Sequence, residues 1–211
     1  MRGLVWFRRD LRVDDNTALY RAAEECDELV LLYVIDREIL NQRNMGYPRV
    51  AFLLESLKEL KESVEGMGGH LTVRVGRPIE VLKKICEEAD VKRLYFNRDY
   101  SPFALRRDRT VVEILQDMDV RVRTFKDLLL HEPTEILNDY TKQPYATFYP
   151  YWKEWKEKEK EPMLGKPEHL NSLNLKSHEI PEPEDLGFKG AAKVPRGGEI
   201  QAKKLLINFL E

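Results

Sequence analysis

Charged residues that could bind a ligand follow the first apolar run of the chain. Residues 4–7 are apolar, and residues 8–16 alternate basic and acidic side chains. Two successive arginines, Arg8 and Arg9, could grip a phosphate or a hydroxylated chain if they stand at the end of a strand. In the other interpretation, an Asp or Asn of this run caps the next helix and the arginines form surface ion pairs. The spacing of these residues leaves both interpretations open.

Two later loops place polar residues beside an aromatic side chain. Asp36 follows the second apolar run, and Arg49 lies near the start of the helical pattern after it. Asp99 and Phe103 follow the fourth apolar run in the same way. Open α/β sheets bind ligands at the carboxyl ends of their strands, so these side chains could offer two carboxylates, a guanidinium group and a ring to one planar ligand. The alternative is that each loop is only a turn rich in helix caps.

Several common reaction centres are missing from the sequence. No GxGxxG follows the first apolar run and no GxxxxGK[ST] occurs, so a standard dinucleotide or nucleoside triphosphate site is not supported. Cys26 and Cys86 are far apart and have no second ligand at metal spacing, which supports neither a disulfide framework nor a zinc site. We expect surface or structural roles for the histidines, which are His70, His131, His169 and His178.

The composition predicts one sizeable domain with a tail. The chain has 211 residues, of which 42% are hydrophobic and 34% charged, enough to bury a core. Lys+Arg 35 against Asp+Glu 37 leaves a net charge of −2, which argues against a protein that holds duplex DNA by charge alone. No stretch approaches the roughly 18 consecutive apolar residues of a membrane span, and cysteine usage fits a reducing compartment, so we expect a cytoplasmic protein.

The elements that must position these residues alternate over the first part of the chain. Strands are predicted at residues 4–7, 29–35, 71–75, 93–96 and 120–125, with helical patterns between them. The nearly unbroken apolar run 29–35 is typical of a strand covered on both faces, as in a parallel sheet. The pattern predicts a doubly wound α/β fold with about five parallel strands.

The pattern breaks after residue 125, and three regions are expected. Residues 1–130 form the α/β domain, residues 131–198 an aromatic and Pro-rich connector that packs on it, and residues 199–211 a helix. The aromatic cluster at residues 145–155 could stack bases, but packing onto the sheet is favoured because the cluster carries no net positive charge. The last helix has a broad apolar face that needs a cover.

Four motifs, in order along the chain, resemble the photolyase and cryptochrome family. They are LVWFRRDLRVDDN at 4–16, YFNRDYSPF at 95–103, LLHEP at 129–133 and PYATFYPYW at 144–152. The segment PRGGE at 195–199 resembles the family's border between its two domains. The resemblance implies an N-terminal α/β domain that holds an antenna chromophore, in a family whose C-terminal helical domain holds FAD.

In that family the antenna passes excitation energy to reduced FAD, which donates an electron to a pyrimidine dimer flipped out of the duplex. The resemblance therefore implies the antenna domain of a deoxyribodipyrimidine photolyase without its catalytic FAD domain, inactive alone, with residues 199–211 as the first helix of the missing domain. No catalytic residue and no metal ligand is carried over. The implied partner is that FAD-binding helical domain, fused or separately encoded, and damaged DNA would bind only through it.

A second hypothesis comes from another functional class. The chain could be a free-standing flavin-binding or protein-interaction module without repair activity, which would form a homodimer through its C-terminal helix.

The resemblance also implies a type of chromophore. Folate-binding relatives contact the pterin through an Asn-Glu pair at the position of Phe103 and Ala104, so folate is disfavoured. Relatives that bind a deazaflavin, or FMN or FAD in the same pocket, match better. Their pocket positions correspond to Arg9, Tyr33, Asp36, Met45, Arg49, Asp99, Phe103 and Asp108. We expect the two arginines near the polar side chain of the ligand, Phe103 against its ring, and Asp36 and Asp99 in hydrogen bonds with it.

Overall fold

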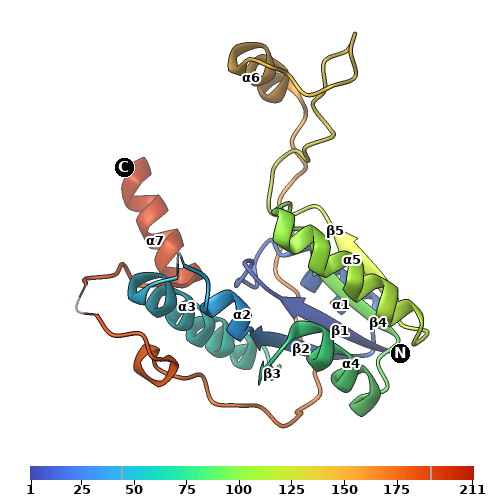
Figure 1. The fold of residues 1–211 in the computed structure, drawn as a ribbon, viewed down its shortest axis with the longest axis vertical. Coiled ribbons are helices and arrows are strands. Elements are labelled where there is room, and N and C mark those ends of the chain that lie inside the picture. Colours follow the sequence, from blue (N-terminus) through green and yellow to red (C-terminus); the bar gives the residue numbers. More distant parts are fainter. Residues whose placement is uncertain (44, 191) are drawn as a thin grey trace.

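A computed structural model describes residues 1–43, 45–190 and 192–211. Within them, five parallel strands form one sheet in the order β3-β2-β1-β4-β5. The strands are β1 (Arg2–Phe7), β2 (Glu28–Ile35), β3 (Leu71–Val75), β4 (Arg93–Asn97) and β5 (Arg121–Phe125). The strand order reverses between β1 and β4, which is where doubly wound sheets open a crevice for ligands. The predicted fold class is confirmed, and each predicted strand is present (Figure 1).

Helices cover both faces of the sheet (Figure 1). The core on one face includes residues of α1 (Thr17–Glu25) and α3 (Tyr47–Gly66), and the core on the other includes residues of α4 (Pro78–Glu88) and α5 (Pro102–Gln116). Two short elements were not predicted, α2 (Arg37–Leu40) and the 3-10 helix η1 (Pro183–Leu186).

Strand β2 accounts for the unbroken apolar run. Leu31 and Tyr33 pack into the core with α1 and α3, whereas Leu32 and Val34 pack into the core with α4 and α5. Successive side chains of a strand point to opposite faces, so a strand covered on both faces has no polar position.

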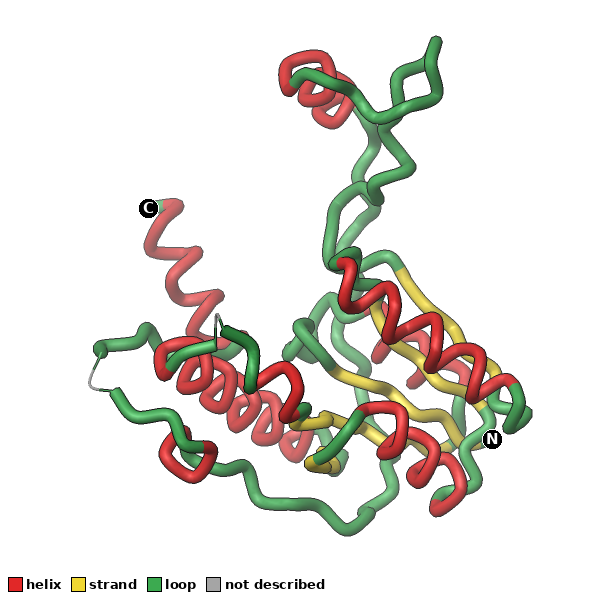
Figure 2. The backbone as a smooth tube through the Cα atoms, viewed as in Figure 1, coloured by secondary structure: helices red, strands yellow, loops and turns green. Residues whose placement is uncertain are grey.

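The segment that follows β5, residues 126–198, divides into an arm and then a strap, and the strap carries η1. The arm carries α6 (Phe148–Glu157) and stands away from the sheet, and most of it is loop (Figures 1 and 2). The strap returns along the body, where Leu29 donates its backbone N–H to Asn171 and accepts from that of Leu173. The structure describes every residue of α6 and none of them is buried, so the expectation that these aromatic side chains pack onto the sheet is wrong for this helix.

Helix α7 (Glu199–Leu210) follows the strap and contacts α3. Its outer half projects from the body (Figure 1), and Phe209 and Leu210 are exposed. Across the described parts of the chain, no helix is both long and apolar enough to cross a membrane.

Candidate functional site

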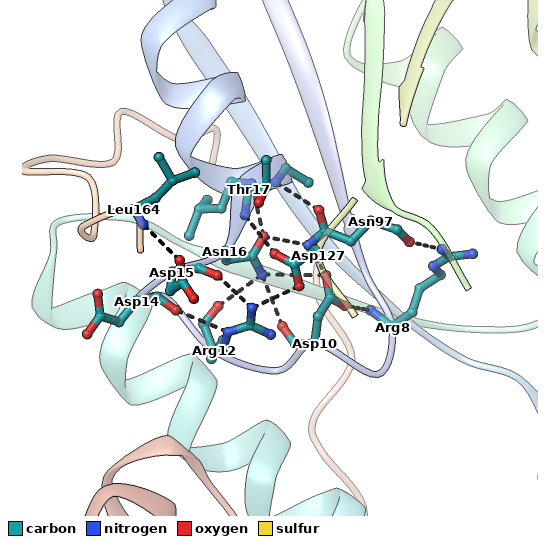
Figure 3. Close-up of polar contacts among 12 residues, drawn as sticks. Arg8, Asp10, Arg12, Asp14, Asp15, Asn16, Thr17, Asn97, Asp127 and Leu164 are labelled. Atoms are coloured by element: carbon teal, nitrogen blue, oxygen red, sulfur yellow. Dashed lines mark hydrogen bonds and ion pairs between the residues drawn. The ribbon is translucent and has the colours of Figure 1, made fainter. Parts of the chain in front are cut away.

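The loop after β1 is held by a buried network of polar side chains (Figure 3). Asn16 caps α1, because its side-chain oxygen accepts from the backbone N–H of Leu19 at 3.1 Å. The Asn16 amide nitrogen donates to the carbonyl oxygens of Asp10 and Arg12, each at 3.1 Å. The capping interpretation of this loop is therefore right for Asn16.

Asn97, the last residue of β4, joins this network from the neighbouring strand. Its Nδ2 donates to Asp10 Oδ2 at 2.6 Å and to Asn16 Oδ1 at 2.9 Å, and its Oδ1 accepts from the N–H of Ala18 at 3.0 Å. Asp10, Asn16 and Asn97 are all buried. Buried polar groups are tolerated when their hydrogen bonds are made, and here they fix the ends of β1 and β4 relative to each other.

The arginines of the loop after β1 have different surroundings. Arg8 forms a bidentate ion pair with Asp108 of α5, with 2.7 and 2.6 Å between Nη1 and the two carboxylate oxygens, and Arg12 pairs with Asp127 at 2.8 Å. Arg9 lies 3.7 Å from Asp99, and 68% of its side chain is exposed. All three arginines thus form ion pairs, although the Arg8 pair is buried and not at the surface as expected, and Arg9 stays largely open to solvent and to a ligand.

A cavity of about 1090 Å³ opens at the carboxyl ends of β1, β2 and β4. Its walls include the loop after β1, the end of β2, the first turns of α3 and α5, and one side of α7. Polar groups and aromatic rings both face it, which is typical of sites for planar cofactors.

Seven of the eight residues that the sequence analysis selected line this one cavity. They are Arg9, Tyr33, Asp36, Met45, Arg49, Asp99 and Phe103. Asp108, the eighth, is not among the lining residues that the structure describes. It forms ion pairs with Arg8 and Arg107, both of which line the cavity, and so holds two side chains of the cavity wall in place.

The pKa values of the two predicted ligand-binding carboxylates are shifted in opposite directions. Burial raises the pKa of Asp36, whose carboxylate also caps α2 by accepting from the N–H of Glu38 at 2.9 Å. Burial acts on the pKa of Asp99 in the same direction, but hydrogen bonds from Ser101 and the positive charges of Arg9 and Arg8 outweigh it and hold that pKa below its usual value. Asp36 therefore accepts a proton more readily than Asp99.

Helix α7 contributes a wall that the sequence analysis did not assign. Glu199, Ala202, Lys203 and Leu206 line the cavity. Lys203 bridges Asp14 at 2.6 Å and Glu199 at 2.7 Å, which ties α7 to the loop after β1.

Carboxylates of α3 hold the start of α7. Gly197 donates its N–H to Glu55 at 2.9 Å, and Ile200 donates its N–H to Glu59 at 2.7 Å. A Cβ on Gly197 would collide with the carbonyl oxygen of Phe52, and Gly198 has a φ of +111°. The sequence analysis took PRGGE only as a domain border, but its Gly-Gly pair is a signal from which this close approach could have been predicted.

Trp6 and Arg107 also line the cavity without having been selected. Trp6 lies in an apolar strand and Arg107 in an amphipathic helix, so each fitted a structural role from the sequence alone. No group of side chains that could hold a metal ion is found among the described residues.

Comparison with known proteins gives one consistent result. The family model for DNA photolyase matches residues 3–169. An uncharacterized 31.6 kDa protein of Synechococcus sp. (strain PCC 6716) is 31% identical over 98% of this chain and 74% of its own length. The deoxyribodipyrimidine photo-lyase of Halobacterium salinarum is 32% identical over 99% of this chain and 46% of its own length.

Among solved structures, an archaeal photolyase from Sulfolobus tokodaii with two FAD molecules superposes with a TM-score of 0.80. It is 26% identical and matches 98% of this chain, which covers 46% of that protein. The chain thus spans just under half the length of the photolyases that it matches here.

Proposed function

The chain belongs to the DNA photolyase family, and we propose that it is the domain that holds the family's antenna chromophore. The observation that carries the proposal is that seven of the eight residues selected from the sequence line the same cavity. It lies beside the point where the strand order reverses, the usual ligand position in this class of fold.

We propose a ligand of the flavin or deazaflavin type. Phe103 supplies an aromatic face, Asp36 and Asp99 supply hydrogen-bond acceptors, and Arg9 supplies an exposed cation toward a polar or phosphorylated side chain. The two FAD molecules of the Sulfolobus photolyase are consistent with a flavin of this kind. A folate chromophore is disfavoured, because Phe103 and Ala104 occupy the position at which folate-binding relatives have an Asn-Glu pair.

The partner that we propose is an FAD-binding helical domain, fused or separately encoded. In photolyases of about twice this length, the region that is similar to this chain is only one part. Phe148 and Tyr149 of α6 and Phe209 and Leu210 of α7 are exposed, and neighbouring large apolar side chains on a surface are typical of an interface. On this proposal the chain alone, supplied with FAD and light, repairs no pyrimidine dimers.

Binding of the chromophore can be measured directly. Titration of the ligand-free protein into FMN or 8-hydroxy-5-deazaflavin should shift the ligand's fluorescence, and Arg49→Ala should weaken binding. Arg121→Ala is the matched control, because Arg121 is an exposed residue of β5 that does not line the cavity. Absence of binding for both ligands at high micromolar concentration would contradict the proposal.

The 31.6 kDa relative favours a second candidate, because this chain accounts for three quarters of its length. In that case the chain is a free-standing interaction module that dimerises through α7. A protein that stays colourless, binds neither ligand and elutes as a dimer would support this candidate over the first.

A further inference from the structure

Trp6 lies at the wall of the cavity with two guanidinium groups over its indole ring. The Cζ atom of Arg107 is 4.8 Å from the ring centroid and that of Arg8 is 5.0 Å from it. All three residues line the cavity, although only 2% of Trp6 is exposed. The neutral indole is stabilised by this arrangement, because its electron-rich face attracts cations.

Both arginines are fixed in place by the same carboxylate. Asp108 binds Nη1 of Arg8 through both oxygens, and its Oδ1 accepts from Nε of Arg107 at 2.9 Å. Exposure of the three side chains is only 7% for Arg8, 12% for Arg107 and 14% for Asp108. Arginine stays protonated in proteins, so this triad places two positive charges and one negative charge beside the ring.

The charge of the triad matters for the photochemistry of a bound chromophore. A flavin bound in the cavity would become a one-electron oxidant on excitation, and Trp6 could supply that electron and become an indole radical cation. Return of the electron to Trp6 would restore the neutral indole, and the light energy would be lost as heat. The two guanidinium carbons lie 5.0 and 4.8 Å from the indole centroid, so their net positive charge repels an indole radical cation and opposes the loss of an electron from Trp6.

We propose that Arg8 and Arg107 prevent Trp6 from quenching the excited chromophore, so that its energy remains available for transfer to another group. The proposal rests on the proposed function, because it requires an excited ligand in the cavity. It assigns Arg107 a role in the lifetime of the excited state that is separate from any contribution to affinity.

The fluorescence lifetime of bound FMN tests the proposal. Arg107→Met keeps an unbranched side chain but removes the charge, and it should shorten the lifetime at least about twofold. Arg107→Lys retains the charge and should keep the wild-type lifetime. The decisive variant is Arg107→Met combined with Trp6→Phe, which removes the electron donor and should restore the lifetime. Tyr33 is present in every variant, so any quenching by Tyr33 is the same in all of them and does not affect the comparison of lifetimes.

Time-resolved decay separates bound from free FMN, so a change in affinity does not imitate a change in lifetime. An unchanged lifetime in Arg107→Met, or a shortened one that Trp6→Phe does not restore, would overturn the inference and leave the proposed function intact. If neither FMN nor 8-hydroxy-5-deazaflavin binds, the proposed function fails instead.

Discussion

The Asn97 side chain donates a 2.6 Å hydrogen bond to the Asp10 carboxylate, across the two strands between which the sheet order reverses. Asp10 also accepts from the N–H of Arg8 at 2.8 Å, so its carboxylate is held on both sides while buried. This contact fixes the loop after β1 against the end of β4, and both segments line or support the cavity.

Removal of this contact should destabilise the whole domain. Asn97→Leu removes one of the partners of the buried Asp10 carboxylate and the side-chain partner of the Ala18 N–H, which we expect to lower the free energy of unfolding by about 2–4 kcal/mol. Asn208→Ala is the control, because Asn208 is exposed on α7. Urea unfolding followed by circular dichroism measures both variants, and similar midpoints for the two would contradict the role of the network.

Asp36 should oppose stability at neutral pH. Burial raises its pKa above the value in the unfolded chain, so the native state binds the proton more readily, and stability falls as pH rises through the interval between the two pKa values. Asp36→Asn retains a side-chain oxygen for the N–H of Glu38 but carries no charge. Its thermal midpoint should exceed that of the wild type at pH 7.

The higher thermal midpoint of Asp36→Asn should disappear as the pH falls below about 3.9, the pKa of Asp in the unfolded chain. Below that pH the side chains of both proteins are neutral. Thermal unfolding from pH 3 to pH 8 checks the sign. A wild type more stable than the variant at pH 7 would mean that the carboxylate has a stabilising partner.

The two cysteines should differ in reactivity toward thiol reagents. Cys86 is buried, and burial raises its pKa to about 12, so almost no thiolate forms at pH 8. Cys26 is half-buried, and its Sγ lies 3.4 Å from the Tyr95 hydroxyl. Labelling of the folded protein should therefore stop at one thiol, and Cys26→Ser should abolish it. Rapid labelling of Cys86 in the native state would indicate that the core with α4 opens readily.

The sequence was sufficient to predict the strands of the sheet, because the pattern of apolar and polar residues along a strand is a local property. The two packed faces of β2 account for every apolar residue of that strand, and the run could be recognised without knowledge of its neighbours. The positions of Asp36, Asp99 and Phe103 followed in turn, since Asp36 directly follows β2, Asp99 lies in the loop after β4 and Phe103 lies in the first turn of α5.

Long-range contacts account for what was missed. The wall formed by α7 depends on Glu55 and Glu59, which are more than 130 residues earlier in the chain and look like ordinary surface residues of α3. The position of α6 depends on the arm that carries it, and its aromatic composition was equally compatible with packing on the sheet. In both cases the residues of the helix predict that a helix forms. Where the helix lies depends on residues that are distant in the sequence.

The contact between Gly197 and α3 should control the shape of the cavity. A Cβ at Gly197 would meet the carbonyl oxygen of Phe52, which is backbone and cannot move without distorting α3. Gly197→Ala should therefore release α7, remove its wall from the cavity and weaken FMN binding roughly tenfold, or about 1.4 kcal/mol. Hydrogen exchange of residues 199–210 and the fluorescence titration measure the two effects separately. Gly165→Ala is the matched control, because nothing lies within 4 Å of its added Cβ; faster exchange in α7 with unchanged affinity would show that its wall contributes nothing to binding.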